Sequence, residues 1–337
     1  MVAIDAMGGD FAPHAICEGV IIAAKLGIPL TLFGPQDTLQ RILGDLDPLW
    51  QSYAISIVHA PDVIEMGEEP VQAVRKKPNA SLVLAVSSVK NGICSSVISA
   101  GSSGALMAAA TLILGRAPGV ERPAIAGLLP TALGQPVVAL DLGACVECKP
   151  SYLYQFAHLG VAYAQQVLGI KIPRVGLLAN GSEDSKGNAL TKEVFNLLKE
   201  SSLAFVGNVE PQDIAHHKID VLVCDGFSGN ILLKSMEATA EVVVGVFMQQ
   251  VQLLEHESDR LVGKKLIKKI RESSVLADQG GAPLLGVQGT VIVAHGNSNA
   301  QTMARGIALA YKSSLADQVI GLNKLINTVL KKGELGL

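Results

Sequence analysis

The segment SVISAGSSGALMAAATLIL, residues 96–114, contains the pattern that decides the fold. Four residues typical of a buried strand lead into a turn of small residues, Ala100-Gly101-Ser102-Ser103-Gly104, and an apolar helical stretch follows at once. The same order of short apolar run, small polar loop and helix recurs along most of the chain. Strands that alternate with helices in this way predict a doubly wound α/β fold around a mainly parallel sheet.

The expected elements cover most of the chain. Strands are expected at 2–5, 30–33, 55–59, 96–99, 125–129, 137–141, 175–179, 204–207, 221–224 and 291–294. Helices are expected at 13–26, 36–45, 79–91, 103–114, 151–168, 188–201, 229–250 and 298–316. Because no low-complexity linker separates these elements, we expect a single α/β domain over residues 1–337.

Residues 230–277 differ from the rest because they show two long helical patterns and no strand. A helical pair without an intervening strand should project from the sheet as a dimer or partner element. The second helix is amphipathic, with Val262, Leu266, Ile267 and Ile270 on its apolar side and Lys264, Lys265, Lys268, Lys269 and Arg271 on its basic side. The basic side is either a solvated surface over a packed apolar one, or a contact site for an acidic protein or anionic lipid headgroups.

The composition limits the class of protein. The chain is 49% hydrophobic and 17% charged, which suits a sheet covered by helices on both faces. A net charge of −3 without a basic tail argues against a nucleic-acid partner. No apolar run approaches the roughly 20 residues that span a bilayer, and the start MVAIDAMGGD lacks the cationic region of a signal peptide. We therefore expect a cytoplasmic protein.

The cysteines point the same way. Five cysteines without a framework pattern are typical of a reducing compartment. Cys145 and Cys148 form a lone CxxC pair with no partner at zinc spacing, so we expect two packed thiols and no metal site.

Six loops of small and polar residues follow expected strands, at 5–10, 99–104, 141–149, 180–188, 225–230 and 295–299. Ligands bind beyond the carboxyl ends of the strands in such sheets, so we expect the six loops to meet at one sheet edge and line a pocket. Their backbone N–H groups, hydroxyls and amides suit an anion. A serine before a helix is also an ordinary N-cap, so a single loop of this kind is a weak signal.

The sequence offers donors for an anion without an obvious nucleophile. There is no G-x-x-x-x-G-K-[ST], no G-x-G-x-x-G followed by an acid, no HExxH and no G-x-S-x-G. This indicates a reaction in which phosphate itself attacks a thioester. The protein then supplies placement, charge neutralisation, and donors for the developing oxyanion and the departing thiolate.

Two side chains are candidates for the chemistry. Lys186 lies in a Ser-Lys-Gly turn and could meet negative charge, although a solvated lysine at a helix start would have the same sequence. His295 directly follows an apolar strand and could protonate the thiolate or bind phosphate, or serve only in the structure. Lys149 could pair with Asp141 or with phosphate. Acidic loop residues such as Asp5 and Asp225 are more often caps or turn residues than catalytic acids.

In this order, the loops resemble those of the bacterial phosphate acyltransferases of phospholipid synthesis, the fatty acyl-acyl carrier protein:phosphate acyltransferases. The matching stretches are IDAMGGDFAP (4–13), SAGSSGALMAAATLILGR (99–116), DLGACVECKP (141–150), LLANGSEDSKGN (177–188), VCDGFSGNILLK (223–234) and GGAPLLGVQGTVIVAHGNSNA (280–300). They span nearly the whole chain.

The resemblance implies a Rossmann-like α/β/α fold akin to the phosphotransacetylases and the isocitrate/isopropylmalate dehydrogenases. It implies reversible transfer of a fatty acyl group from acyl carrier protein to inorganic phosphate, giving acyl phosphate, without metal, nucleotide or other cofactor. It further implies a homodimer that contacts the membrane, and the downstream membrane acyltransferase, peripherally.

By motif position, the resemblance places Lys186 and His295, our two candidates for the chemistry, in the family's presumed pocket. The implied binding residues are Asp5, Gly8, Gly9, Gly101, Ser102, Ser103, Gly104, Lys149, Asn180, Ser182, Asp225, Asn230 and Asn299. The family more often has Asn-Thr in place of Ser102-Ser103 and Asn in place of Cys145, which leaves the role of the Cys145 loop open.

Three alternatives are weighed against this interpretation. A phosphotransacetylase would take acyl groups from coenzyme A, but the basic helix at 264–271 favours a strongly acidic carrier protein. A non-enzymatic acyl- or membrane-binding scaffold would use the amphipathic helix alone. A dehydrogenase is disfavoured because the dinucleotide fingerprint and a carboxylate cluster for a divalent metal are missing from the sequence.

Overall fold

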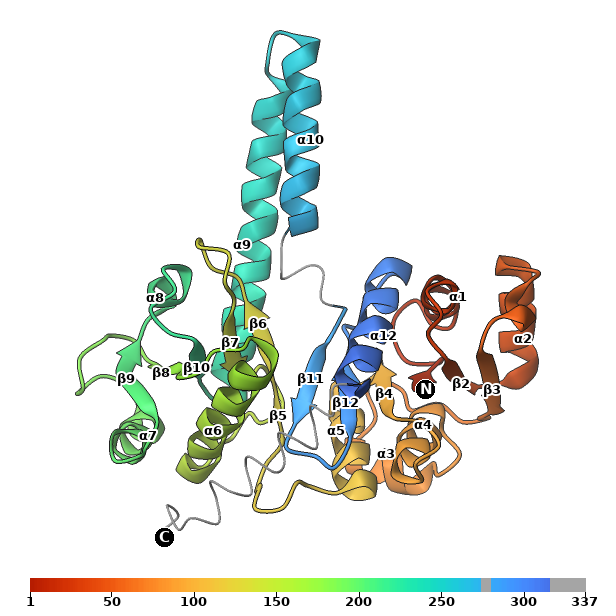
Figure 1. Cartoon of the computed structure of the whole chain (residues 1–337), viewed down its shortest axis with the longest axis horizontal. Coiled ribbons are helices and arrows are strands. Elements are labelled where there is room, and N and C mark those ends of the chain that lie inside the picture. The colour runs from red at the N-terminus through yellow and green to blue at the C-terminus, as the bar shows by residue number, and fades with distance from the viewer. Residues whose placement is uncertain (274–279, 316–337) are drawn as a thin grey trace.

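The computed structural model describes residues 1–273 and 280–315 and contains two mainly parallel β-sheets side by side (Figure 1). In spatial order, the first sheet comprises β3 (Ile55–His59), β2 (Leu30–Gly34), β1 (Val2–Asp5), β4 (Ser96–Ser99), β12 (Thr290–Val293), β11 (Ala282–Leu285) and β5 (Ala124–Ile125). The second sheet comprises β6 (Gly127–Leu129), β7 (Val137–Leu140), β10 (Val221–Val223), β8 (Arg174–Leu178) and β9 (Ala204–Val209). Among the strands that the structure describes, β11 pairs antiparallel with its two neighbours and β6 pairs antiparallel with β7, whereas the other pairs are parallel.

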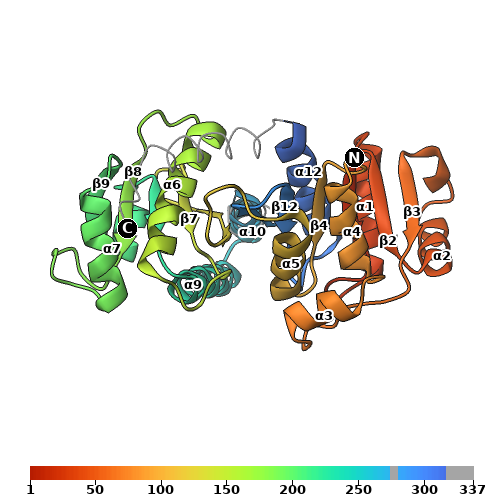
Figure 2. The same cartoon turned by 90° about the horizontal axis from the view of Figure 1, so that it is seen from below.

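Helices cover both faces of each sheet (Figure 2). On the first sheet, α1 (His14–Lys25), α2 (Gln36–Leu46) and α12 (Ala300–Leu315) pack on one face, and α4 (Ser81–Lys90) and α5 (Ser103–Ala109) pack on the other. On the second sheet, α6 (Pro150–Val167) and α7 (Ala189–Lys199) pack on one face, and α8 (Pro211–Ala215) and the first turns of α9 (Gly226–Gln252) pack on the other. A short helix, α3 (Pro70–Lys76), contacts α5. Every residue of the central strands β1, β4, β7 and β12 is buried, as expected for parallel strands covered by helices on both faces, although β4 has the sequence Ser-Val-Ile-Ser.

One hydrophobic cluster joins the two sheets. It contains Leu106 of α5 on the first sheet and Leu142, which follows β7 in the second, and Leu233 of α9 packs against it. The chain crosses between the sheets at Ala126, which separates β5 from β6. The two sheets are therefore held together by shared apolar packing as well as by the chain itself.

The doubly wound α/β architecture is confirmed, but the prediction that all six loops meet at one edge of a single sheet is wrong. Residues 125–129, expected as one strand, divide into β5 and β6, which belong to different sheets. Three of the six loops therefore follow strands of the first sheet and three follow strands of the second. The sequence also missed β11, because its proline argues against a strand, and the short helices α3 and α8.

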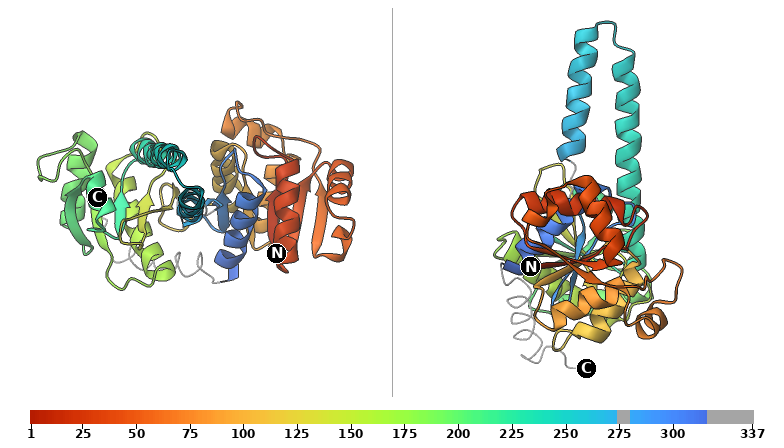
Figure 3. Two further views of the ribbon diagram at one scale, coloured as in Figure 1. Left: turned by 90° about the horizontal axis from the view of Figure 1, so that it is seen from above. Right: turned by 90° about the vertical axis from the view of Figure 1, so that its right-hand side faces the viewer.

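The helical pair does project from the body, as expected. Helices α9 and α10 (Glu257–Ser273) stand out as a hairpin from the region between the two sheets (Figure 3). Of the four residues on the apolar side of α10, Ile267 is buried, whereas Val262, Leu266 and Ile270 are exposed. The expectation of a packed apolar side is thus wrong for three of the four, because α9 covers only part of α10. In the described ranges, no helix is both long and apolar enough to cross a membrane.

Candidate active site

The first-sheet loops, residues 5–10, 99–104 and 295–299, meet around the buried carboxylate of Asp5. This group ends β1 and accepts hydrogen bonds from the hydroxyls of Ser81 at 2.6 Å and Ser99 at 2.7 Å. Burial raises the pKa of Asp5, and the hydrogen bonds from the two serines partly offset this. The third loop joins the group because the N–H of Asp10 donates to the carbonyl of Gly296 at 2.8 Å.

The second-sheet loops, residues 141–149, 180–188 and 225–230, are organised in part by another buried carboxylate, Asp141. Its oxygens accept four backbone N–H groups, from Ile125 (2.9 Å), Gly143 (3.2 Å), Ala144 (3.0 Å) and Cys145 (2.6 Å). Burial also raises the pKa of Asp141. The N–H of Gly226 donates to the carbonyl of Cys145 at 2.8 Å, which ties the first of these loops to the start of α9.

Both groups of loops depend on a glycine beside the carboxylate. A Cβ at Gly8 would lie 2.6 Å from the backbone nitrogen of Gly101, and a Cβ at Gly226 would lie 2.6 Å from the carbonyl oxygen of Cys145. These approaches are too close for any side chain. In each sheet, therefore, a glycine after a strand, Gly8 after β1 and Gly226 after β10, lets the backbone of a neighbouring loop approach the buried carboxylate.

The other predicted residues of the first sheet lie near helix starts. Ser102 is the N-cap of α5, and its hydroxyl accepts from the N–H of Ala105. Gly9 and Gly101 lie in the loops beside Asp5, Ser103 is the first residue of α5, and Gly104 packs against Pro70. The side chain of Asn299 accepts from the N–H of Thr302 at 3.0 Å, at the start of α12.

On the second sheet, the loop 180–188 is held by Asn180, whose side chain accepts from the N–H of Gly187 at 2.9 Å. Ser182 and Lys186 are exposed on this loop. Asp225 caps α9 by accepting from both the N–H and the hydroxyl of Ser228.

Lys149 does not pair with Asp141. The oxygens of Asp141 are occupied by backbone N–H groups, and the Lys149 ammonium lies 5.9 Å from the centre of the Tyr152 ring. The pairing of Lys149 with phosphate stays a prediction.

A bridging cluster of three side chains, Lys234, Glu237 and His295, connects the two groups of loops. The Nε2 atom of His295 lies 3.9 Å from Oε1 of Glu237, whose Oε2 accepts from Nζ of Lys234 at 2.9 Å. Partial burial of the ring is the larger of two effects that lower the pKa of His295, and the positive charge of Lys234 lowers it further. His295 comes from the first sheet, whereas Lys234 and Glu237 belong to α9.

Sequence reasoning missed Lys234 and Glu237. The signal that could have found them is helical spacing, since they follow Asn230 at i+4 and i+7 and so share one side of α9. Asn230 itself is exposed and lies against Gly143. This side of α9 will be called its polar face.

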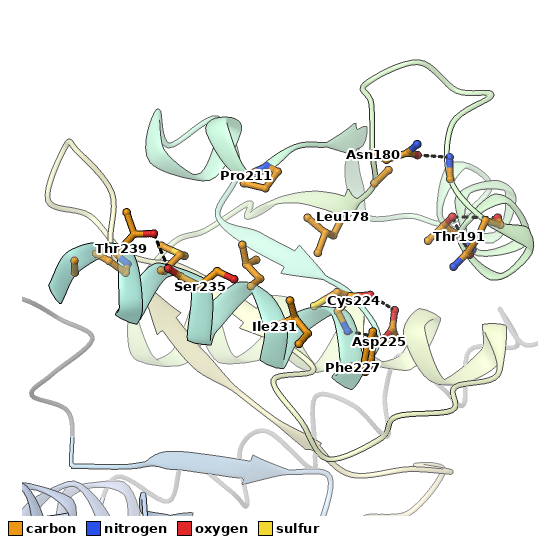
Figure 4. Close-up of a pocket in the computed structure, with 18 of the residues that line it drawn as sticks. Leu178, Asn180, Thr191, Pro211, Cys224, Asp225, Phe227, Ile231, Ser235 and Thr239 are labelled. Carbon is orange, nitrogen blue, oxygen red and sulfur yellow. Dashed lines mark hydrogen bonds between the residues drawn. The ribbon is translucent and has the colours of Figure 1, made fainter. Parts of the chain in front are cut away.

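A cavity of about 1200 Å³ lies along another side of α9 (Figure 4). Its polar end is formed by Asn180, Asp225 and Ser228, beyond the carboxyl ends of β8 and β10. The remainder is mainly apolar, with Ile231, Met236 and other α9 residues facing Pro130, Leu178 and Pro211. The side of α9 that lines the cavity will be called its apolar face, after the apolar residues Phe227, Ile231, Leu232, Met236, Ala240 and Val243.

The fold is that of the phosphotransacylases. A phosphotransacetylase from Streptococcus pyogenes matches with a TM-score of 0.59 at 17% identity, covering 94% of each chain. A branched-chain phosphotransacylase from Enterococcus faecalis V583 matches with a TM-score of 0.52 at 14% identity, covering 92% of this chain and 97% of that one.

Sequence comparison defines the family. The model described as fatty acid synthesis protein matches residues 1–320. A protein of Desulforamulus reducens named phosphate acyltransferase is 46% identical over 314 residues, 92% of each chain, and one of Bacillus cereus AH820 with the same name is 43% identical over 336 residues, 98% of each. The chain therefore belongs to the fatty acid synthesis protein family, which confirms the resemblance seen in its loops.

Proposed function

We propose that this chain is a phosphate acyltransferase that transfers a fatty acyl group from acyl carrier protein to inorganic phosphate, giving acyl phosphate. The names of its relatives support this proposal. The observation that carries it is the bridging cluster, which sets a histidine and a lysine from different parts of the chain beside glycine-rich loops of both sheets. Cationic and N–H donors converging between parallel strand ends suit an oxyanion.

The proposed reaction needs no nucleophile from the protein. A phosphate oxygen attacks the thioester carbonyl carbon, the carbon–sulfur bond of the tetrahedral intermediate breaks, and the thiolate of the carrier leaves with the electron pair. The enzyme neutralises the dianion, donates to the developing oxyanion and lets the thiolate take a proton. Lys186 and Lys234 supply positive charge in this scheme, and the binding residues inferred from the sequence supply donors.

His295 is better suited to binding phosphate than to protonating the thiolate. Partial desolvation and the positive charge of Lys234 lower the pKa of His295, which favours the neutral imidazole and weakens it as an acid. A neutral imidazole still has one N–H to donate to phosphate. We therefore assign His295 a binding role, beside Lys234.

The projecting hairpin is the proposed site of assembly. Exposed apolar side chains of Val242, Val246 and Phe247 on α9 and Leu266 and Ile270 on α10 would be covered in a homodimer. The exposed lysines 264, 265, 268 and 269 would meet the acidic carrier protein or the membrane where the downstream acyltransferase works. Arg271 belongs to α10, but its side chain lies outside the described part of the structure.

The fold itself favours one alternative donor, coenzyme A, since its solved neighbours include phosphotransacetylases. The two donors are distinguished by assaying acyl phosphate formation from acyl carrier protein thioesters and from coenzyme A thioesters over a salt series. We expect faster turnover of the carrier-protein substrate, weakened by salt and by replacing the four exposed lysines with glutamate. Faster, salt-insensitive turnover of the coenzyme A substrate would overturn the choice of donor.

A further inference from the structure

We propose that the cavity along the apolar face of α9 binds the acyl chain of the substrate, with the thioester at its polar end. The inference rests on the proposed function and adds a chain-binding subsite to it. Helix α9 then serves both substrates. Its polar face carries Lys234 and Glu237 towards His295, and its apolar face lines the cavity.

The lining of the cavity is suited to a hydrocarbon. Phe227, Ile231 and Val243 line it and are 59%, 53% and 48% exposed, respectively. Apolar surface left in water at one place on a protein marks a binding site, because covering it with an apolar ligand is favourable. The volume of about 1200 Å³ lies just above the roughly 300–1,000 Å³ that is usual for a small-molecule site, which suits a long ligand.

The shape of the cavity also fits a chain. Its α9 lining runs from Phe227 to Val243 at helical spacing. A helix rises about 1.5 Å per residue, so the wall from Ser228 at the polar end to Val243 is about 22 Å long. An extended chain of single bonds advances roughly 1.2 Å per bond, as an extended backbone does. The wall therefore matches an acyl chain of about 16 to 18 carbons.

The orientation follows from where the polar groups lie. Asn180, Asp225 and Ser228 line the cavity around the first turn of α9, the turn that also precedes Asn230 on the polar face. A thioester at this end would lie beside the loop 180–188 that carries Lys186. The methyl end of the chain would point along α9 towards Thr239 (Figure 4) and, beyond it, Val243.

Burying one methylene gives about 0.8 kcal/mol, which is roughly a fourfold change in kcat/KM. With carrier-protein thioesters of 6 to 20 carbons, kcat/KM should therefore rise with chain length up to about 16 to 18 carbons and then level off. The slope per methylene should be largest where the chain is fully enclosed.

The sharpest test fills the far half of the cavity. Ala240 lines it, whereas Ala238 is exposed on the same helix and does not, so Ala238→Phe is the matched control. We expect Ala240→Phe to lower kcat/KM for 16-carbon substrate at least tenfold and to leave 6-carbon substrate within twofold. Ala238→Phe should leave both substrates near wild type.

Turnover of the short substrate shows whether each variant is folded. Should Ala240→Phe not fold, Ser235→Asp places a charge in the middle of the same lining at an exposed position, and the same selective loss of long substrates is expected. Equal losses for short and long chains, or a selective loss in Ala238→Phe instead, would overturn the subsite. If the wild-type protein forms no acyl phosphate from any carrier-protein thioester, the proposed function fails instead.

Discussion

Each sheet has a buried carboxylate at the end of a strand, and different donors hydrogen-bond to it in the two sheets. In the first, Asp5 is held mainly by two serine hydroxyls, and in the second, Asp141 is held by four backbone N–H groups. A hydroxyl can donate or accept, whereas an N–H can only donate. The first arrangement can thus adapt to a changed side chain, and the second depends on both oxygens being acceptors.

The largest stability effect is expected for Asp141→Asn. The new amide turns an NH₂ group towards at least one backbone N–H, with the 2.6 Å contact to Cys145 the most sensitive. Losing such charge-assisted bonds in a buried site should lower the free energy of unfolding by about 3 kcal/mol. Urea denaturation measures the free energy of unfolding. If Asp141→Asn lowers it no more than Asp5→Asn does, the proposed difference between the two carboxylate sites is wrong.

Lys186→Ala tests whether the second-sheet loops also supply charge to the reaction. Losing one strong transition-state donor should reduce turnover about 100-fold with little change in stability. Lys192→Ala is the control, since Lys192 is also exposed and lies nearby in α7. Steady-state assays decide, and wild-type turnover for Lys186→Ala would remove this residue from the mechanism.

Asp5→Asn should lower the free energy of unfolding by about 1 kcal/mol at pH 7, which is less than Asp141→Asn. The loss is smaller because the hydroxyl of Ser81 or Ser99 can turn to accept a hydrogen bond from the new amide. Its pH dependence has a defined sign. Burial raises the pKa of Asp5 in the folded state, so protonation favours folding, and this stabilisation is lost as pH rises through the folded pKa. The stability of the wild type relative to Asp5→Asn should therefore increase as the pH falls from about 7 towards about 4, measured by urea denaturation at each pH. An opposite trend would contradict the assigned environment.

The smallest effect concerns the bridging cluster. Lys234→Ala removes a positive charge that lowers the pKa of His295 and leaves Glu237, which raises it. The pKa of His295 should therefore increase, and an NMR titration of its ring protons measures the change. Lys264→Ala, on the exposed side of α10, should leave that pKa unchanged. An unchanged or lower value in Lys234→Ala would show that the cluster is not formed in solution.

The sequence predicted much of the fold because strand, loop and helix alternate with clear apolar patterns. It could not separate the two sheets, since the chain changes sheet at Ala126 inside a single apolar run. Loop residues were found because small polar residues after a strand mark the ends of parallel strands. Helical spacing could have grouped Lys234 and Glu237 with Asn230 on one side of α9. It could not show that this side faces His295 or that another side lines a cavity, because both depend on how α9 packs against the two sheets.

The central claim is that both sheets contribute to one phosphate site, through His295 and Lys234. The most direct test is a double-mutant cycle on kcat/KM for phosphate with His295→Ala, Lys234→Ala and the double variant. If both side chains contact the same ion, the coupling energy should be at least about 1 kcal/mol. Effects that add to within about 0.3 kcal/mol would contradict the claim, because the two residues would then act at separate places.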